Sequence, residues 1–224
     1  EAWESRHRRS LDTVPAAEAV NRAGMASGIG GPLVLADLAD NPGGGGTGDA
    51  TGLLRAMIDA NLPDAAFATI CDPASAQICW DNGLGAIVHL ELGGKADPAY
   101  GPPIAVRATV QALTRGRFAM RGPMAAGVRV ELGPTAVVRV GGVDVVVASR
   151  RYQAHDAMFF QHAGIDPAAK RVIAVKSAHH FRAAFQPLAS GVLLVDDGGG
   201  LTSADVKART YTKVRRPIFP LDMD

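Results

Sequence analysis

The chain has 224 residues, of which 47% are hydrophobic and 20% charged, so it can bury a sizeable core as one domain or two small ones. Its 23 basic and 22 acidic residues are spread along the sequence and give a formal net charge of +1, which excludes a polybasic stripe for nucleic acid or anionic lipid. No apolar run approaches the roughly 20 residues that cross a bilayer. We therefore expect neither nucleic acid nor a membrane as a partner.

The amino-terminal segment reads as a connector rather than as a leader peptide. The first residue is Glu1, and the polar stretch that follows has no apolar signal-peptide core, so we expect the sequence to begin inside a longer chain. A helix is predicted over residues 1–9, and a second one, capped by Thr13, is predicted to run through Ala26. Residues 1–30 are thus expected to form a helical connector from an upstream domain.

A predicted alternation of strands and helices follows the connector. Apolar runs predict strands, and turn or capping residues predict where helices begin, with Asp49 as one cap and Pro73 in the first turn of the next helix. Such alternation favours a parallel sheet with helices on its faces. The expected order is a strand at 32–39, a glycine-rich loop at 40–49, a helix at 51–60, a strand at 65–72, a helix from Pro73 and a strand at 86–93.

The middle of the chain changes character. Residues 104–149 alternate apolar with polar side chains between glycine and proline turns, which predicts antiparallel hairpins. Helix and strand alternation then resumes with a helix at 155–163, a strand at 171–177, a helix after His179 and a strand at 191–197. The fold class is therefore α/β, a mixed sheet with a parallel βαβ core, flanking helices and an inserted block of antiparallel hairpins, with residues 31–224 as one domain.

Only two cysteines occur, Cys71 and Cys79. Their spacing fits neither a disulfide framework nor a zinc knuckle. Buried, reduced thiols in a cytoplasmic protein are the expected state.

The glycine-rich loop is the first candidate for chemistry. It runs DNPGGGGTGD from Asp40 to Asp49, at the carboxyl end of a predicted strand, where ligands of open α/β sheets bind. Asp40, Asn41, Gly43 and Gly44 are its candidate substrate-binding residues. The loop lacks the Lys-Ser/Thr ending of a nucleotide P-loop. Three interpretations stay open: the lining of an active-site cleft, an anion- or nucleotide-binding loop, and a flexible turn in which Asp40 and Asn41 are local turn formers.

A second candidate is VKSAHHFRAAF, residues 175–185. Lys176, His179, His180 and Arg182 gather near a predicted helix start, a suitable place to bind a carboxylate or to stabilise a developing oxyanion. Adjacent helical side chains point about 100° apart, so the two histidines cannot easily chelate one metal together. The segment is interpreted as a polar wall of a cleft, with a packed or capping histidine as the alternative.

The remaining polar residues are interpreted as structural. His155 and His162 are seven positions apart, too far for one zinc ion, Asp156 is expected to cap a helix, and His89 lies within a strand. The sequence has no HExxH, GxSxG or paired-cysteine motif. No metal ligand and no self-sufficient catalytic constellation is predicted in this chain.

Three segments together resemble the C-terminal domain of the MlrC (microcystinase C) family. They are VLADLADNPGGGGTGDATGLLRAMID near the start, VIAVKSAHHFRAAFQPLA late in the chain and RRPIFPLD at the end. They occur in the family's order, and shorter matches such as ICDPASAQICWDNGLGAIVHLELGGK lie between them. The resemblance covers nearly the whole chain beyond residue 30.

The resemblance implies a zinc-dependent peptidase that hydrolyses small, microcystin-like peptides. In that family the zinc ligands lie in an N-terminal domain, which becomes the expected partner, so no ligand is assigned here and the isolated chain is expected to be inactive. Residues 40–49 and 176–182 would then line the cleft between the two domains. Two alternatives stay open: a structural or dimerisation module that uses an unpaired edge of the 104–149 hairpins to form a homo-oligomer, and an anion-binding module built on the glycine loop.

Overall fold

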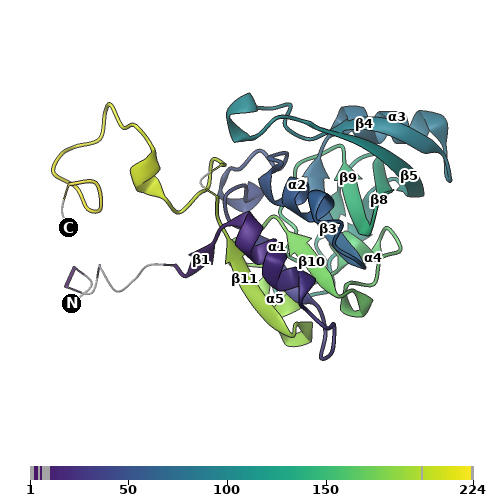
Figure 1. Cartoon of the computed structure of the whole chain (residues 1–224), viewed down its shortest axis with the longest axis horizontal. Helices are drawn as coiled ribbons and strands as arrows, with labels where there is room; N and C mark the ends of the chain where they lie inside the picture. Colours follow the sequence, from purple (N-terminus) through teal and green to yellow (C-terminus); the bar gives the residue numbers. More distant parts are fainter. Residues whose placement is uncertain (1–2, 5, 7–10, 198, 223–224) are drawn as a thin grey trace.

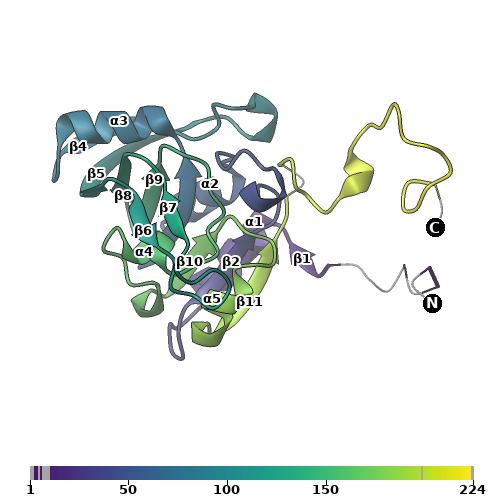
Figure 2. The ribbon, with the colours of Figure 1, turned by 180° about the vertical axis from the view of Figure 1, so that it is seen from behind.

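The computed structural model describes residues 3–4, 6, 11–197 and 199–222. Within these residues, nine strands form one mixed sheet and two more form a small separate sheet, with helices on both faces (Figures 1 and 2). The strands are β1 (Thr13–Val14), β2 (Leu33–Asp37), β3 (Ala65–Cys71), β4 (Ile87–Leu92), β5 (Ile104–Thr114), β6 (Arg117–Ala119), β7 (Arg129–Glu131), β8 (Thr135–Val140), β9 (Val143–Ala148), β10 (Val172–Val175) and β11 (Gly191–Val195). The helices are α1 (Ala16–Gly24), α2 (Gly52–Asp59), α3 (Pro73–Asn82), α4 (Met158–Gln161) and α5 (Arg182–Phe185).

The large sheet has the order β1-β11-β2-β10-β3-β9-β8-β5-β4. The strands from β1 to β9 in this order pair in parallel, and β9, β8, β5 and β4 pair antiparallel. β10 is buried throughout and β3 nearly so, as expected for parallel strands covered by helices on both sides. The predicted fold class, a mixed α/β sheet with inserted hairpins, is confirmed.

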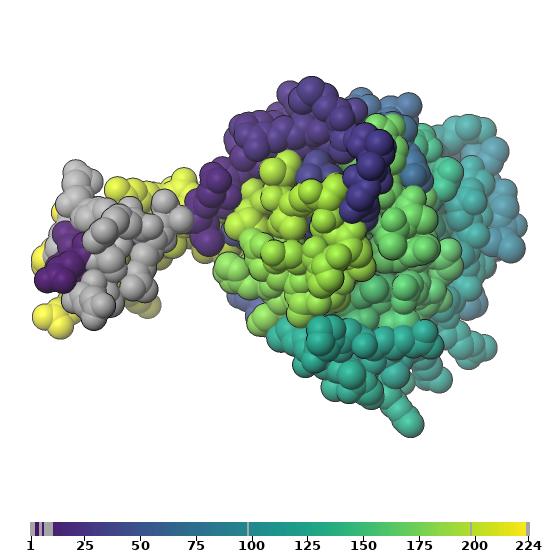
Figure 3. Space-filling view, turned by 90° about the horizontal axis from the view of Figure 1, so that it is seen from below, coloured from purple at the N-terminus to yellow at the C-terminus, as the bar shows by residue number. Residues whose placement is uncertain are grey.

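The sheet separates two hydrophobic cores. On one face the apolar sides of α1, α2 and α3 bury Leu54, Met57 and Cys79 against the strands. On the other face α4, α5 and the β6–β7 hairpin bury Phe159, Phe160 and other aromatic rings. Figure 3 shows the teal segment that contains β6 and β7 lying against the yellow-green surface near α5. Residues 104–149 therefore supply strands of the large sheet and also a hairpin that covers one of its faces.

The amino-terminal segment belongs to the same body. β1 pairs with β11, and four residues of α1 are buried. The predicted Thr13 cap is wrong, because Thr13 lies in β1 and Pro15 precedes the helix without a side-chain cap. Instead, the Ala16 N–H donates to Asp197 Oδ1 at 2.5 Å. The helix predicted over residues 1–9 falls largely outside the described residues, and the domain boundary at residue 30 stays a prediction.

The position of β4 corrects the predicted parallel run. β4 lies at the edge of the sheet and pairs antiparallel with β5, and its residues alternate between exposed and buried, as in an edge strand with one solvated face. β5, β8 and β9 are each paired on both sides. Among the described residues, the free edge of the large sheet on this side therefore belongs to β4 and not to the strands of the hairpin block.

Three local predictions also differ from the structure. The helix expected at 155–163 is only α4. Asp156 lies at its start, where Oδ1 accepts a hydrogen bond from Met158 N as expected of a capping residue, while Oδ2 accepts from the N–H groups of residues 121 and 122. The Asp49 carboxylate does not cap α2; it accepts hydrogen bonds from the Lys95 and Ala96 N–H groups. The cysteines are unpaired as expected, but only Cys79 is buried, whereas Cys71 is half-buried.

The carboxyl-terminal segment from about residue 209 stands away from the body (Figures 1 and 2). Among the residues that the structure describes, no helix has the length and apolar character required to span a membrane.

The start of α3 depends on Asp72, which the sequence analysis did not single out. The buried Asp72 carboxylate accepts hydrogen bonds from Ser75 N, Ser75 Oγ and Gly93 N at 3.1, 2.7 and 3.0 Å, and it pairs with Lys95. Although desolvation by burial opposes ionisation, these donors outweigh it and lower the pKa of Asp72 below its ordinary value. The carboxylate thus joins α3 to the loop after β4.

Asp72→Ala is expected to lower the free energy of unfolding by about 2 kcal/mol, because it removes a helix cap and leaves buried N–H groups unpaired. Urea unfolding at neutral pH checks this. Asp97→Ala is the matched control, since Asp97 caps a three-residue turn through one exposed bond to Ala99 N. An equal loss in the two variants would contradict the proposed role of Asp72.

Candidate functional site

The loops that follow the parallel strands gather at one edge of the sheet. The glycine-rich loop follows β2, the 176–182 segment follows β10, and these two strands are neighbours with matched register. Ligands of open α/β sheets bind at the carboxyl ends of the strands. The two segments that the sequence analysis selected are therefore brought together at the edge where a ligand is expected.

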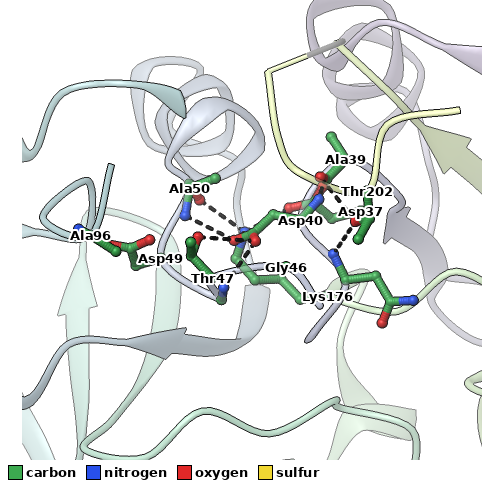
Figure 4. A network of polar contacts seen from close by, with 12 residues as sticks. Asp37, Ala39, Asp40, Gly46, Thr47, Asp49, Ala50, Ala96, Lys176 and Thr202 are labelled. Carbon is green, nitrogen blue, oxygen red and sulfur yellow. Dashed lines mark hydrogen bonds and ion pairs between the residues drawn. The ribbon is translucent and has the colours of Figure 1, made fainter. Parts of the chain in front are cut away.

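Asp40 organises the glycine-rich loop. Its carboxylate is fully buried, and Oδ1 accepts hydrogen bonds from Thr47 Oγ1 at 3.1 Å and from Gly48 N at 2.9 Å, while Oδ2 accepts from Ala50 N at 2.8 Å (Figure 4). The side chain therefore holds the loop from inside and does more than form a local turn.

Lys176 lies beneath the same loop and is fully buried. Its Nζ is 2.8 Å from Asp37 Oδ2, 3.0 Å from Asp40 Oδ2 and 2.8 Å from the Ala50 carbonyl oxygen (Figure 4). Desolvation disfavours the ammonium, but the two carboxylates outweigh it and raise the pKa of Lys176. In the structure this side chain anchors the loop, and its selection as a substrate-binding group stays a prediction.

The two carboxylates that share Lys176 have different acidities. Burial raises the pKa of Asp37, and attraction to Lys176 does not compensate. For Asp40, burial is outweighed by Lys176 and by the N–H donors of Gly48 and Ala50, so its pKa is lowered. Lys176 thus lies between two carboxylates, and the one with the lowered pKa, Asp40, forms with it a buried ion pair that fixes the loop.

Two glycines of the loop are required by close contacts. A Cβ on Gly43 would lie 2.3 Å from Gln153 Oε1, and a Cβ on Gly46 would lie 2.6 Å from Asp40 Oδ1. Gly43 and Gly44 are exposed, whereas Asn41 is buried. The N–H groups of residues 43–46 donate to oxygens of Asn41 and Pro42. The loop backbone is thus closed on itself.

The histidine segment is joined to the loop after β9 by Gln153. With Gln153 Nε2 donating to Ser177 Oγ at 2.9 Å, Gln153 Oε1 lies 2.9 Å from His180 Nδ1. The Gln153 carbonyl oxygen also lies 2.9 Å from His155 Nδ1, and the rings of His155 and His180 are 6.3 Å apart. We refer to Gln153, Ser177 and His180 as the Gln153 relay.

The Gln153 relay fixes the tautomer of His180. Because Gln153 Oε1 only accepts, the hydrogen of this bond must lie on His180 Nδ1, and Nε2 is left as the ring atom available to a ligand. His180 and His179 are both exposed, and the His179 side chain makes no hydrogen bond or ion pair within the described parts of the chain. Two imidazoles are therefore presented at the edge of the sheet.

The Arg182 side chain makes its contacts within its own segment. Its guanidinium lies 5.3 Å from the centre of the Phe181 ring and donates to Gln186 Oε1 at 3.3 Å. Its role in substrate binding stays a prediction.

The Gln153 relay was missed by the sequence analysis. Gln153 and Ser177 belong to no recognisable motif, and His155 was interpreted as structural. Their proximity follows only from the topology, because the loops after β9 and β10 meet across β3. A polar residue shortly after each of two buried strands was the only available signal.

A cavity of about 150 Å³ adjoins the glycine-rich loop. Asp37 and Asp197 supply carboxylates to its wall, Tyr100 supplies an aromatic ring, and Ala39 and Ala50 are the residues that flank the loop. The cavity is small, so it can accept a single side chain or a terminal group rather than a whole peptide.

The side chains gathered here do not fit a zinc site. Within residues 11–197 and 199–222 and the few described residues before them, no three histidine, cysteine or carboxylate side chains are grouped to hold a metal ion. The carboxylates of Asp37 and Asp40 are taken up by Lys176 and by backbone donors.

Comparisons with known proteins agree with this architecture. The model of the family described as MlrC C-terminus matches residues 35–213. The chain is 34% identical over 191 residues to Microcystinase C from Sphingomonas sp., covering 85% of this chain and 36% of that protein. It is 26% identical to the solved structure of a proposed metallopeptidase from Mesorhizobium sp. BNC1, which it matches with a TM-score of 0.85 over 100% of this chain and 44% of that one. The chain therefore spans less than half of each relative, and it belongs to the MlrC C-terminal domain family.

Proposed function

We propose that this domain forms one wall of the substrate cleft in a metallopeptidase that hydrolyses small peptides, with the catalytic zinc held by another domain of the same enzyme. Support comes from the names of the two relatives, a Microcystinase C and a proposed metallopeptidase, each of which extends far beyond the matched region. The absence of a metal-binding group among the described residues leaves the zinc to that other region, which is then the partner of this domain.

The Gln153 relay is the observation that carries the proposal. It holds the exposed His180 at the carboxyl edge of the sheet, beside His179 and close to the glycine-rich loop through the contact between Gly43 and Gln153. A peptide ends in a carboxylate, and its carbonyl oxygen gains negative charge during hydrolysis. Held through Nδ1, His180 can donate from Nε2 to either group in its imidazolium form, in which both ring nitrogens carry a hydrogen. In this role His179 and His180 contact the substrate, while Asp40 and Lys176 hold the loop in place.

The contacts of the loop weigh against the anion-binding alternative. An anion site needs free N–H groups that point at the ligand, but the N–H groups of residues 43–46 already donate within the loop. Gly43 and Gly44 contribute instead by shape, since the absence of side chains at these exposed glycines lets a peptide approach the backbone. The buried Asn41 closes the loop by accepting a hydrogen bond from Gly43 N. The structural or dimerisation alternative is favoured by the free edge of β4.

The test compares metal content and peptide hydrolysis for this chain alone and for the chain joined to the metal-binding domain that the proposal requires. We expect stoichiometric zinc and hydrolysis of short linear peptides only in the joined form. Stoichiometric, tightly bound zinc in the isolated chain would show that the metal site is misplaced. Full hydrolysis by the metal-binding domain alone would favour the structural role.

The unpaired cysteines accord with action in the cytoplasm, which is part of the proposal. Burial raises the pKa of Cys71 and of Cys79 to about 11 each, so both remain as thiols and react slowly at neutral pH.

A further inference from the structure

A second polar cavity lies on the antiparallel side of the molecule, separate from the candidate site. Its volume is about 330 Å³, within the size range of small-molecule pockets. The lining combines three arginines with one carboxylate and one indole ring. The lining residues are Trp80, Arg115, Arg117, Glu131, Gly133, Pro134 and Arg150.

The charges of this cavity are not balanced internally. Glu131 is the only acidic residue in the lining, and it is shared between Arg117 and Arg150 at 3.4 Å each. The Arg115 side chain forms no hydrogen bond or ion pair with any other described residue. The lining therefore carries an excess of two positive charges, and guanidinium groups bind carboxylates and phosphates through paired N–H donors.

The backbone around the cavity is firmly connected. Leu132 N donates to the Gly116 carbonyl oxygen, and Arg150 N donates to the Leu132 carbonyl oxygen, both at 2.8 Å, so the segments that carry the three arginines are tied together. A Cβ on Gly116 would lie 2.4 Å from the Gly133 carbonyl oxygen. The Trp80 Nε1–H donates to the Thr135 carbonyl oxygen at 3.3 Å, which orients the indole. These contacts hold in place the backbone that carries the lining and the indole ring of Trp80.

We propose that this cavity binds a small organic carboxylate, with the carboxylate held by Arg115 and Arg150 and its apolar part against Trp80. The excess positive charge selects an anion, and the indole face selects one that carries an apolar group. The proposal does not depend on the peptidase function, because none of the lining residues belongs to the Gln153 relay or to the glycine-rich loop.

The experiment uses the fluorescence of Trp80. The chain has two tryptophans, so Trp3→Phe leaves Trp80 as the only reporter. Cyclohexanecarboxylate, which carries an apolar ring and does not absorb in the indole band, is titrated at constant ionic strength beside cyclohexanecarboxamide and inorganic phosphate. We expect a saturable change in Trp80 fluorescence with cyclohexanecarboxylate and no change with the neutral amide.

Arg115→Gln and Arg150→Gln should each weaken carboxylate binding about tenfold or more, as for the loss of a hydrogen bond to a charged group. Arg129→Gln is the matched control, since Arg129 lies in the β6–β7 hairpin with Arg117 but outside the cavity lining. Carboxylate binding by this control should stay within about twofold of the parent. Equal weakening in the control, absence of saturation, or saturable binding of phosphate alone would each overturn the proposal.

Discussion

Lys176→Met is expected to destabilise the domain by about 3–5 kcal/mol at neutral pH, the usual cost of removing one partner of a buried ion pair. Methionine fills a similar volume, so the loss comes mainly from Asp37 and Asp40, whose carboxylates would remain buried without a cation. Urea unfolding followed by circular dichroism measures the change. Lys213→Met is the matched control, because Lys213 is exposed and its loss should cost within about 0.5 kcal/mol.

The pH dependence separates this explanation from a simple packing defect. Because the pKa of Asp40 is lowered in the folded protein, its ion pair contributes stability above the ordinary aspartate pKa, and this contribution is lost as the pH falls through the folded value. The raised pKa of Asp37 has the opposite effect on stability, because it favours the folded protein as the pH falls. In the Lys176→Met variant, protonation at lower pH removes the uncompensated negative charge of the buried Asp37 and Asp40. The difference in stability between parent and variant should therefore shrink from about pH 7 to about pH 4.5, whereas a packing defect would leave it unchanged.

A second change isolates the buried charge. Adding Asp37→Asn to Lys176→Met should recover part of the lost stability, because only one uncompensated carboxylate then remains. No recovery would mean that the ammonium is not the group that stabilises the two aspartates.

The sequence predicts the parallel half of the sheet well because its strands are continuous apolar runs. The strands predicted at 65–72 and 171–177 correspond to β3 and β10 within a few residues, since each is covered by helices on both faces. β4 was also predicted as a strand, but its direction depends on its pairing with β5. Local periodicity carries no information about strand order, so β4 was placed in the parallel run.

The candidate site was predictable in its segments but not in its connections. The sequence placed residues 40–49 and 176–182 each at the end of a predicted strand, and in the structure those two strands are neighbours. The opposite burial of Lys176 and His180 follows from whether a side chain points under the loop or out of it, which the sequence does not encode in a motif. Gln153 joins the glycine-rich loop to the histidine segment only in the folded chain, because it lies 27 residues from its partner His180.

If the proposed function holds, His180→Ala is expected to lower kcat/KM for a small linear peptide about 10²-fold in this chain joined to its metal-binding domain, without changing the metal content or the unfolding midpoint. The imidazole is exposed and held by Gln153, so its removal deletes a group that contacts the substrate but leaves both hydrophobic cores intact. His89→Ala is the matched control, because His89 lies on β4, away from the carboxyl edge. Equal activity in the His180→Ala variant and the parent would rule out a substrate-binding role for His180.

Gln153 acts on the substrate only through His180 in this scheme, and its variants test that positioning role. Gln153→Leu removes the acceptor for His180 Nδ1 and should lower kcat/KM about tenfold, whereas Gln153→Glu keeps an acceptor oxygen at the same position and should restore most of the activity. Combining Gln153→Leu with His180→Ala should add little to the loss caused by His180→Ala alone, because residues that act as a unit are not additive. Fully additive losses would show that Gln153 contributes independently of the imidazole, and the relay would then be a packing contact rather than a device that orients His180.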